Sequence, residues 1–221
     1  MLYESMAWTC LSWLLGMPVP PCRDSASSTL FFVYHRIFNP KLIMKKIKLY
    51  VATSIDGYIA DKTGGLDWLS GFPITTEFNY GYGEFFDSVD TVIMGGKTYR
   101  DILNMDIIYP YKNKATYVIT RNNTALSAKQ VYFISENIIG NISKLQTSKG
   151  KDIWLVGGGE IVSLFLDYEL IDELILTLIP ITLGTGIPLF PKHSKESKWI
   201  AIKTQKFENG VIQIKYEREK R

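Results

Sequence analysis

The chain is poor in the side chains that most often bind metals or form disulfides. It has two cysteines, Cys10 and Cys22, and two histidines, His35 and His193, that lie far apart in sequence. The part of the chain after Cys22 has no cysteine, so it cannot form a disulfide scaffold or a cysteine-ligated zinc site. The two distant histidines have no evident carboxylate partners, so we predict no bound metal.

Long apolar runs and a strong charge of one sign are also missing. No stretch reaches the roughly 18 apolar residues that a membrane-spanning helix needs, and the apolar stretch 6–15 has no Lys or Arg before it, as a secretory signal would. The net charge of +3 gives no argument for nucleic-acid binding. We therefore expect a cytoplasmic protein that acts on a small molecule, without nucleic-acid or membrane partners.

The composition changes near residue 40, which divides the chain into two parts. Prolines, serines and scattered aromatics fill residues 1–43, whereas Met44 opens a stretch that resembles a gene start running into a strand. We expect 1–43 to be an N-terminal extension, either naturally disordered or upstream sequence included by a wrong start codon. Residues 44–221 are then the functional domain, a size that one domain commonly has.

In the body of the chain, segments with strand character alternate with segments of helical periodicity. Strands are predicted at 47–53, 89–94, 115–120, 131–134, 153–156 and 172–179, and helices at 76–88, 97–103, 138–147 and 160–166. The Asn209-Gly210 pair between two apolar runs predicts a hairpin that joins 200–207 to 211–216. This order indicates an α/β fold with a mainly parallel central sheet, helices on its faces, and a C-terminal antiparallel hairpin.

Two glycine turns lie where a predicted strand meets a predicted helix, the place where α/β sheets bind ligands. One is Gly95-Gly96-Lys97-Thr98, and the other is Gly157-Gly158-Gly159. Glycine allows a phosphate to approach the backbone, and a helix start offers it unpaired N–H groups. The P-loop pattern fails because Thr91 stands where it needs glycine, and the dinucleotide fingerprint G-x-G-x-x-G fails at Val162.

Five short motifs, in this order, resemble the dihydrofolate reductase superfamily. They are Ser54-Ile55-Asp56-Gly57-Tyr58-Ile59-Ala60, Val92 to Tyr99, Val156 to Glu160, Leu176-Thr177, and Pro188-Leu189-Phe190-Pro191. The branch that they resemble contains the C-terminal reductase domain of the bacterial bifunctional riboflavin deaminase-reductase. The resemblance covers nearly all of residues 44–221 and implies a dihydrofolate reductase-like three-layer sandwich that binds NADPH across its sheet.

The resemblance also implies which residues hold the cofactor. Matching positions for the nicotinamide, the phosphates and the adenosine are Ala52, Ile59, Gly95, Gly96, Lys97, Thr98, Thr120, Arg121, Val156, Gly157, Gly158, Gly159, Glu160 and Ile161. It further implies a cis peptide bond between Gly157 and Gly158. One departure stands out, because the family often has an arginine for the 2′-phosphate where this chain has Gly96. Lys97 and Arg121 are the cations expected to replace it.

The substrate side is less well marked. Asp56, Asp67 and Glu77 are the candidate catalytic carboxylates, Asp56 having turn formation beside Gly57 as its other explanation. Trp68 and Thr177 are the candidate substrate-binding residues. The catalytic aspartate of the riboflavin-pathway domain has no clear counterpart near Asp101, so the resemblance does not fix the substrate.

Three functions follow from these expectations. The first is an NADPH-dependent reductase of a small heterocycle, nominally 5-amino-6-(5-phosphoribosylamino)uracil in riboflavin biosynthesis. The second is dihydrofolate reduction, which the missing helix carboxylate disfavours. The third is a nucleotide-binding module without catalysis. An apolar edge at the C-terminal hairpin would permit a homodimer.

Overall fold

The computed structural model describes residues 44–121, 130–191 and 195–219, which form one compact unit from Met44 onward. Cys10, Cys22, His35, His193 and the predicted extension 1–43 lie outside the described residues. The elements are β1 (Ile47–Ser54), β2 (Tyr58–Ala60), η1 (Asp67–Leu69), α3 (Tyr82–Asp87), β3 (Val89–Gly95), α4 (Gly96–Leu103), β4 (Ala115–Ile119), β5 (Val131–Ile134), α5 (Ile138–Thr147), β6 (Asp152–Gly157), α6 (Gly159–Asp167), β7 (Glu173–Ile179), β8 (Ile187–Pro188), β9 (Trp199–Lys206) and β10 (Ile212–Arg218).

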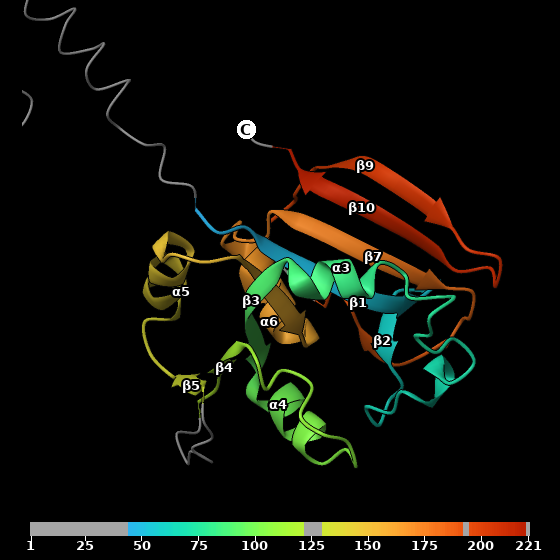
Figure 1. Ribbon diagram of the computed structural model, residues 1–221, viewed down its shortest axis with the longest axis horizontal. Helices are drawn as coiled ribbons and strands as arrows, with labels where there is room; N and C mark the ends of the chain where they lie inside the picture. Colours follow the sequence, from blue (N-terminus) through green and yellow to red (C-terminus); the bar gives the residue numbers. More distant parts are fainter. Residues whose placement is uncertain (1–43, 122–129, 192–194, 220–221) are drawn as a thin grey trace, which may run out of the picture. The chain divides into compact units, whose positions relative to one another are not determined.

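Eight strands form the central sheet in the order β5-β4-β3-β6-β1-β7-β10-β9 (Figure 1). The first six are parallel, and β10 and β9 add an antiparallel edge. The parallel part and the C-terminal hairpin are both as predicted. A separate two-stranded sheet pairs β2 with β8, which the sequence reading did not foresee.

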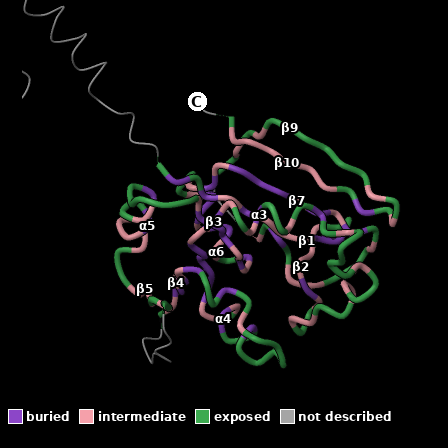
Figure 2. The backbone as a smooth tube through the Cα atoms, viewed as in Figure 1, coloured by how far each residue is buried: buried purple, intermediate pink, exposed green. Residues whose placement is uncertain are grey.

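Helices cover both faces of the parallel part, which gives the predicted three layers. Ile142 of α5 and Phe165 of α6 pack in one buried cluster with Ile47 and Leu49 of β1. Phe85 of α3 and the apolar residues of α4 pack in a second cluster on the opposite face. Successive strand residues point to opposite faces, so the strands buried on both sides are nearly all apolar. Figure 2 shows this burial along β1, β3 and β7 and the exposure of β9.

The helix predicted over 76–88 is wrong for its first half, since α3 begins only at Tyr82. Tyr80 and Gly81 have φ angles of 50° and 72°, outside the right-handed helical region. Phe78 has helical spacing from Tyr82 but packs with Tyr80 in a third apolar cluster instead. The aromatic spacing is therefore produced by a folded loop rather than by one continuous helix.

The C-terminal hairpin turns at Asn209-Gly210, as predicted. Gly210 has a φ of 85°, and its N–H donates to the carbonyl of Phe207 at 3.0 Å. The edge strand β9 leaves Ile200 and Ile202 exposed at 53% and 46%. A homodimer through this apolar edge stays a prediction.

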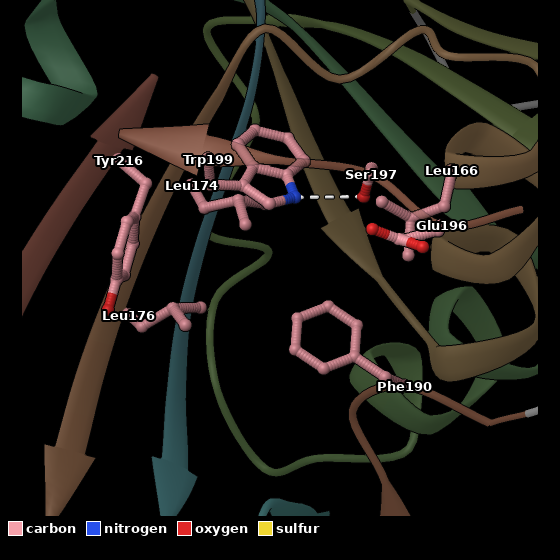
Figure 3. Close-up of a pocket in the computed structure, with 8 residues that line it drawn as sticks. All are labelled: Leu166, Leu174, Leu176, Phe190, Glu196, Ser197, Trp199 and Tyr216. Carbon is pink, nitrogen blue, oxygen red and sulfur yellow. Dashed lines mark hydrogen bonds between the residues drawn. The ribbon is translucent and has the colours of Figure 1, made fainter. Parts of the chain in front are cut away.

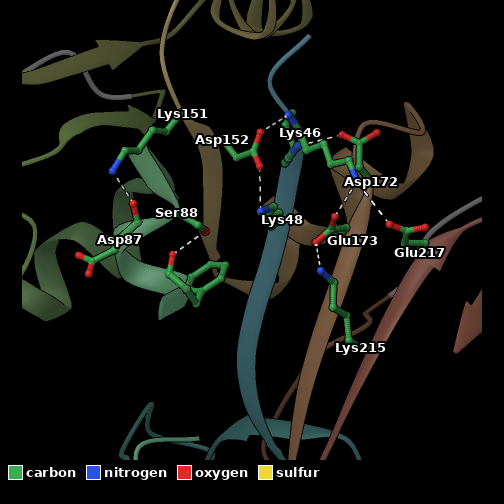
Figure 4. A network of polar contacts seen from close by, with 12 residues as sticks. Lys46, Lys48, Asp87, Ser88, Lys151, Asp152, Asp172, Glu173, Lys215 and Glu217 are labelled. Atoms are coloured by element: carbon green, nitrogen blue, oxygen red, sulfur yellow. Dashed lines mark hydrogen bonds and ion pairs between the residues drawn. The ribbon is translucent and has the colours of Figure 1, made fainter. Parts of the chain in front are cut away.

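Charged side chains gather at the amino ends of β1, β6 and β7 (Figure 4). Glu173 is the buried centre, with its side chain only 4% exposed. Its two carboxylate oxygens lie 2.8 Å from Nζ of Lys46 and 2.7 Å from Nζ of Lys215. On β1 and β6, Lys48 pairs with Asp152 at 2.8 Å. These pairs join four strands at the end of the sheet opposite the glycine turns.

Among the described residues, no helix is long and apolar enough to span a membrane. The same ranges contain no cluster of three or more His, Cys, Asp or Glu side chains able to hold a metal ion.

Candidate functional site

The two predicted glycine turns lie side by side at the carboxyl ends of adjacent strands. Strands β3 and β6 are paired, with Met94 opposite Gly157. Helix α4 starts at Gly96 directly after β3, and α6 starts at Gly159 after β6. The backbone N–H of Gly158 donates to the Thr98 hydroxyl at 3.0 Å, which links the two turns. Two helix N-termini thus meet at one edge of the sheet, where N–H groups and dipoles favour phosphate.

Close packing explains why glycine occupies two of these positions. A Cβ on Gly159 would lie 2.7 Å from the carbonyl oxygen of Pro188, and one on Gly95 would lie 3.0 Å from Cγ1 of Ile161. The peptide bond between Gly157 and Gly158 is cis, as the family resemblance implied. A side chain at position 95 or 159 would therefore press on a neighbouring residue, so each turn has a packing reason for glycine.

The remaining predicted residues of the second turn lie around the start of α6. Glu160 is exposed in the first turn of the helix, and Ile161 is half-buried against Gly95. Val156 is half-buried near the end of β6, in the apolar cluster on the α3 side of the sheet. Glu160 thus contributes an acidic side chain beside this turn.

Positive charge surrounds the first turn. The Lys97 ammonium lies 3.2 Å from the Asp101 carboxylate. A Cβ on Gly64 would lie 3.3 Å from the same ammonium nitrogen. Arg121 is exposed just beyond β4. Thr120 packs against the start of α4, where a Cβ on Gly96 would approach its hydroxyl oxygen to 2.8 Å. The structure thus places Thr120 beside Gly96 at the start of α4, whereas the Lys97 ammonium lies by Asp101 and the loop that contains Gly64.

The predicted nicotinamide residues lie at the centre of the same edge. Ala52 of β1 is opposite Thr177 of β7, and both are on the side of the sheet that α3 covers. Ile59 lies in β2, and its side chain packs with the cluster on the other side. The predicted role of Ile59 requires only its backbone, so this orientation does not affect it.

Beside Ala52 lies a neutral polar cluster that joins Thr177, a predicted substrate-binding residue, to Tyr50 and Gln213, which were not predicted. The Gln213 amide donates to the Thr177 hydroxyl at 2.9 Å and to the carbonyl of Tyr80 at 2.8 Å. The Tyr50 hydroxyl donates to the same carbonyl at 2.9 Å. Burial raises the pKa of Tyr50, which keeps this phenol protonated at neutral pH. The cluster therefore offers hydroxyl and amide groups without a formal charge.

Tyr50 and Gln213 had different chances of being found from sequence. Tyr50 stands two residues before Ala52, so strand alternation alone places both on one face. Gln213 reaches the site only through the pairing of β10 with β7, where it lies opposite Thr177. No local signal in the sequence marks that register.

The three candidate carboxylates do not join this cluster. Asp56 accepts hydrogen bonds from the Ser54 hydroxyl at 2.6 Å and from the backbone N–H groups of Leu183 and Gly184. The bond from Ser54, together with those from the two N–H groups, lowers the pKa of Asp56. Asp67 and Glu77 are both exposed, in η1 and in the following loop. Asp56 thus links the loop after β1 to residues 183–184, which agrees with the expectation that it forms a turn beside Gly57.

Trp68 lies closer to the expected substrate side. It is half-buried in the apolar cluster that contains Tyr80 and Ala52. Its indole N–H is buried and finds no hydrogen-bond acceptor within the described part of the chain. A buried donor without an acceptor is costly, so this N–H is a candidate to bind a ligand.

Comparison with known proteins decides the family. The model of the RibD C-terminal domain matches residues 45–213. The chain belongs to this family. YwjB of Bacillus subtilis (strain 168), an uncharacterized protein, is 38% identical over 174 residues, covering 79% of this chain and 98% of YwjB. A crystal structure from Shewanella sp. PV-4, provisionally assigned to riboflavin biosynthesis, has a TM-score of 0.70 at 32% identity and covers 79% of this chain and 99% of that one.

The fold extends to dihydrofolate reductase. The Enterococcus faecalis enzyme, solved in complex with NADP(H), has a TM-score of 0.58 at 18% identity and covers 79% of this chain and 97% of that one. Such a likeness shows the fold alone. Within the RibD C-terminal domain family, the described elements thus form a dihydrofolate reductase-like α/β sandwich, as the resemblance predicted.

A separate apolar pocket of about 350 Å³ lies on the other face of the sheet in this family member (Figure 3). Leu176 of β7 lines it, whereas its neighbour Thr177 points to the opposite face. Trp199 also lines it, and its indole N–H donates to Ser197 at 2.9 Å. None of the predicted site residues lines this pocket, so it is distinct from the edge of the sheet where the two glycine turns lie.

Proposed function

We propose that residues 44–221 form an NADPH-dependent reductase of a small heterocyclic compound. The hydrogen bond from the Gly158 N–H to Thr98, at 3.0 Å, is the observation that carries the proposal. It holds the starts of α4 and α6 together at the carboxyl edge of the parallel sheet. A dinucleotide has two linked phosphates that match two adjacent helix starts. Membership of a reductase-domain family supports the same conclusion.

When bound, NADPH would supply the hydride, and the residues of the chain would position the two reactants. The glycine turns and Thr98 would hold the phosphates. Ala52, through its backbone, would hold the nicotinamide beside Thr177, its partner across β1 and β7. The substrate carbon would accept the hydride, and a proton from water would complete the reduction.

The lining of the substrate side favours an uncharged pyrimidine ring, nominally that of 5-amino-6-(5-phosphoribosylamino)uracil. Its ring carbonyl and N–H groups match the hydroxyl and amide groups of Tyr50, Thr177 and Gln213. A pterin that is protonated on binding would need a carboxylate, and Asp56 is engaged with its own loop. The riboflavin assignment of the Shewanella relative points the same way.

Calorimetric titration and turnover test the proposal together. We expect NADPH to bind at micromolar concentration and its absorbance to fall when the aminouracil substrate is added. Dihydrofolate in its place should leave the absorbance unchanged. No binding of either NADPH or NADH below millimolar would refute the cofactor site. Binding without turnover of any heterocycle offered would favour a nucleotide-binding module, and turnover of dihydrofolate would reassign the substrate.

A further inference from the structure

The start of α4 has no space for a side chain beside Thr120. A Cβ on Gly96 would lie 2.8 Å from the Thr120 hydroxyl oxygen and 2.9 Å from its Cβ. Real side chains avoid contacts this short, because packed atoms resist displacement. Position 96 therefore cannot itself carry a cation to this spot without moving Thr120.

Arg100 brings a cation to the same spot from one helical turn further along. Its Nη1 atom lies 3.4 Å from the point that a Cβ on Gly96 would occupy. Residues four apart lie on one face of a helix, which explains this approach. Arg100 is exposed, and its guanidinium has no hydrogen bond or ion pair with any residue in 44–121, 130–191 or 195–219. The group is thus available to an anion that arrives beside Gly96.

The neighbouring cation, Lys97, serves a different place. Its Nζ lies 3.2 Å from the Asp101 carboxylate, which partly matches its charge. A Cβ on Gly64 would lie 3.3 Å from the same Nζ, so Lys97 faces the loop after β2 rather than Thr120. The charged groups of Lys97 and Arg100 therefore lie near different neighbours, Gly64 and Asp101 for Lys97 and Gly96 for Arg100.

We propose that Arg100 binds the 2′-phosphate of NADPH and determines the preference for NADPH over NADH. The inference rests on the proposed function, which puts the phosphates of the cofactor at the starts of α4 and α6. A guanidinium suits a phosphate because two of its parallel N–H groups can donate to two phosphate oxygens at once. NADH carries a hydroxyl at this position and gives the guanidinium no anionic partner. Gly96 leaves the space that the Arg100 side chain uses.

The test compares the dissociation constants of NADPH and NADH for the full chain and three variants. In Arg100→Gln we expect NADPH to bind about 10- to 150-fold more weakly, because the charge-assisted hydrogen bonds to the phosphate are lost. The dissociation constant of NADH should change less than about twofold. Arg100→Lys should keep part of the preference, because it keeps the charge and loses the fork. Lys97→Gln should weaken both cofactors by similar factors, since both carry the pyrophosphate.

Two further readouts separate phosphate binding from a structural role. We expect 2′,5′-ADP to compete with NADPH more strongly than ADP in the wild type and equally in Arg100→Gln. The wild-type preference should fall below about pH 6, where a phosphate monoester takes up a proton. This fall should be absent from Arg100→Gln, because that variant has no preference to lose.

Four results would overturn the inference. Equal weakening of both cofactors in Arg100→Gln would make Arg100 structural, and loss of the preference in Lys97→Gln alone would reassign the phosphate to Lys97. A wild type that binds both cofactors equally would refute the role of Arg100 and leave a reductase that uses either. A wild type that binds neither would refute the proposed function, and the inference with it.

Discussion

Replacement of Glu173 by glutamine should destabilise the domain measurably. The Glu173 carboxylate is 4% exposed, accepts a hydrogen bond from Lys46 at 2.8 Å and forms an ion pair with Lys215 at 2.7 Å. Glutamine keeps the shape and one acceptor but loses the charge. Each hydrogen bond to a charged group contributes about 1.5–3 kcal/mol. Both lysines are partly exposed, at 48% and 32%, and can regain water in the variant. We therefore expect a net loss of roughly 2 kcal/mol in the free energy of unfolding.

The pH dependence gives this prediction a sign. Burial opposes the ionisation of Glu173, but hydrogen bonds from Lys215 and Lys46 outweigh it, so its pKa lies below the ordinary 4.5. A carboxyl group with a lowered pKa in the folded state stabilises above its unfolded pKa. That contribution is lost as the pH falls through the folded value. The difference between wild type and Glu173→Gln should thus be full at neutral pH and shrink below pH 4.5.

Urea unfolding at neutral pH and at about pH 3 measures both effects. Glu217→Gln is the matched control, because Glu217 pairs with Lys46 at 3.3 Å but is 45% exposed. Exposed ion pairs contribute about 0–1 kcal/mol, so the control should stay near wild type. Equal losses in Glu173→Gln and Glu217→Gln would refute the argument from burial. A loss that is unchanged at low pH would refute the argument from charge.

Three other substitutions test the cofactor edge and the core. Gly159→Ala should weaken NADPH binding at least about tenfold, because the new Cβ would strike a backbone carbonyl of β8. The control is Gly83→Ala in α3, where a Cβ has open space. This control should bind NADPH normally and gain about 0.5–1 kcal/mol in the free energy of unfolding by urea. Thr98→Val should cost about 1–3 kcal/mol in NADPH affinity by calorimetry, because the Gly158 N–H loses its acceptor. Lys114→Met should lower the melting temperature by several degrees, roughly 1–3 kcal/mol, because Lys114 donates to two backbone carbonyls at 2.7 and 2.8 Å.

The two glycine turns of the proposed cofactor edge could be located from the sequence because their signals are local. Each glycine turn lies between an apolar strand and a helix within about ten residues, so a short window contains the whole pattern. The pairing of β3 with β6, which brings the turns together, lies outside such a window and is shown by the structure. The structure then adds the bond from Gly158 to Thr98, which no pattern of residue types specifies.

The substrate side could not be predicted in the same way. Tyr50, Thr177 and Gln213 come from three strands, β1, β7 and β10, and meet only through the order and register of the sheet. Register depends on tertiary packing of the whole sheet, and a one-residue shift would turn Gln213 to the other face. The search for acidic residues therefore led to Asp56, Asp67 and Glu77. Neutral side chains form the cluster that the structure shows beside Ala52.

Arg100 illustrates a further limit of prediction from sequence. A comparison of sequences position by position finds glycine at 96 and turns to the cations nearest in sequence, Lys97 and Arg121. The helix brings residue 100 back to the same face, where its guanidinium lies beside Gly96. Under our proposal the 2′-phosphate is bound from one helical turn further along, a contact that no local sequence pattern marks.

The two ends of the sheet should respond independently to substitution. Strand β7 runs from Glu173 to Ile179, so the charged network and the cofactor edge are separated by about 20 Å. Sites this far apart without shared partners usually contribute additively. Glu173→Gln should therefore leave the NADPH dissociation constant within about twofold at temperatures where it is folded. In the double variant with Arg100→Gln, the losses of stability and of affinity should match those of the single variants. A coupling above about 0.5 kcal/mol would show that the sheet transmits strain between its ends.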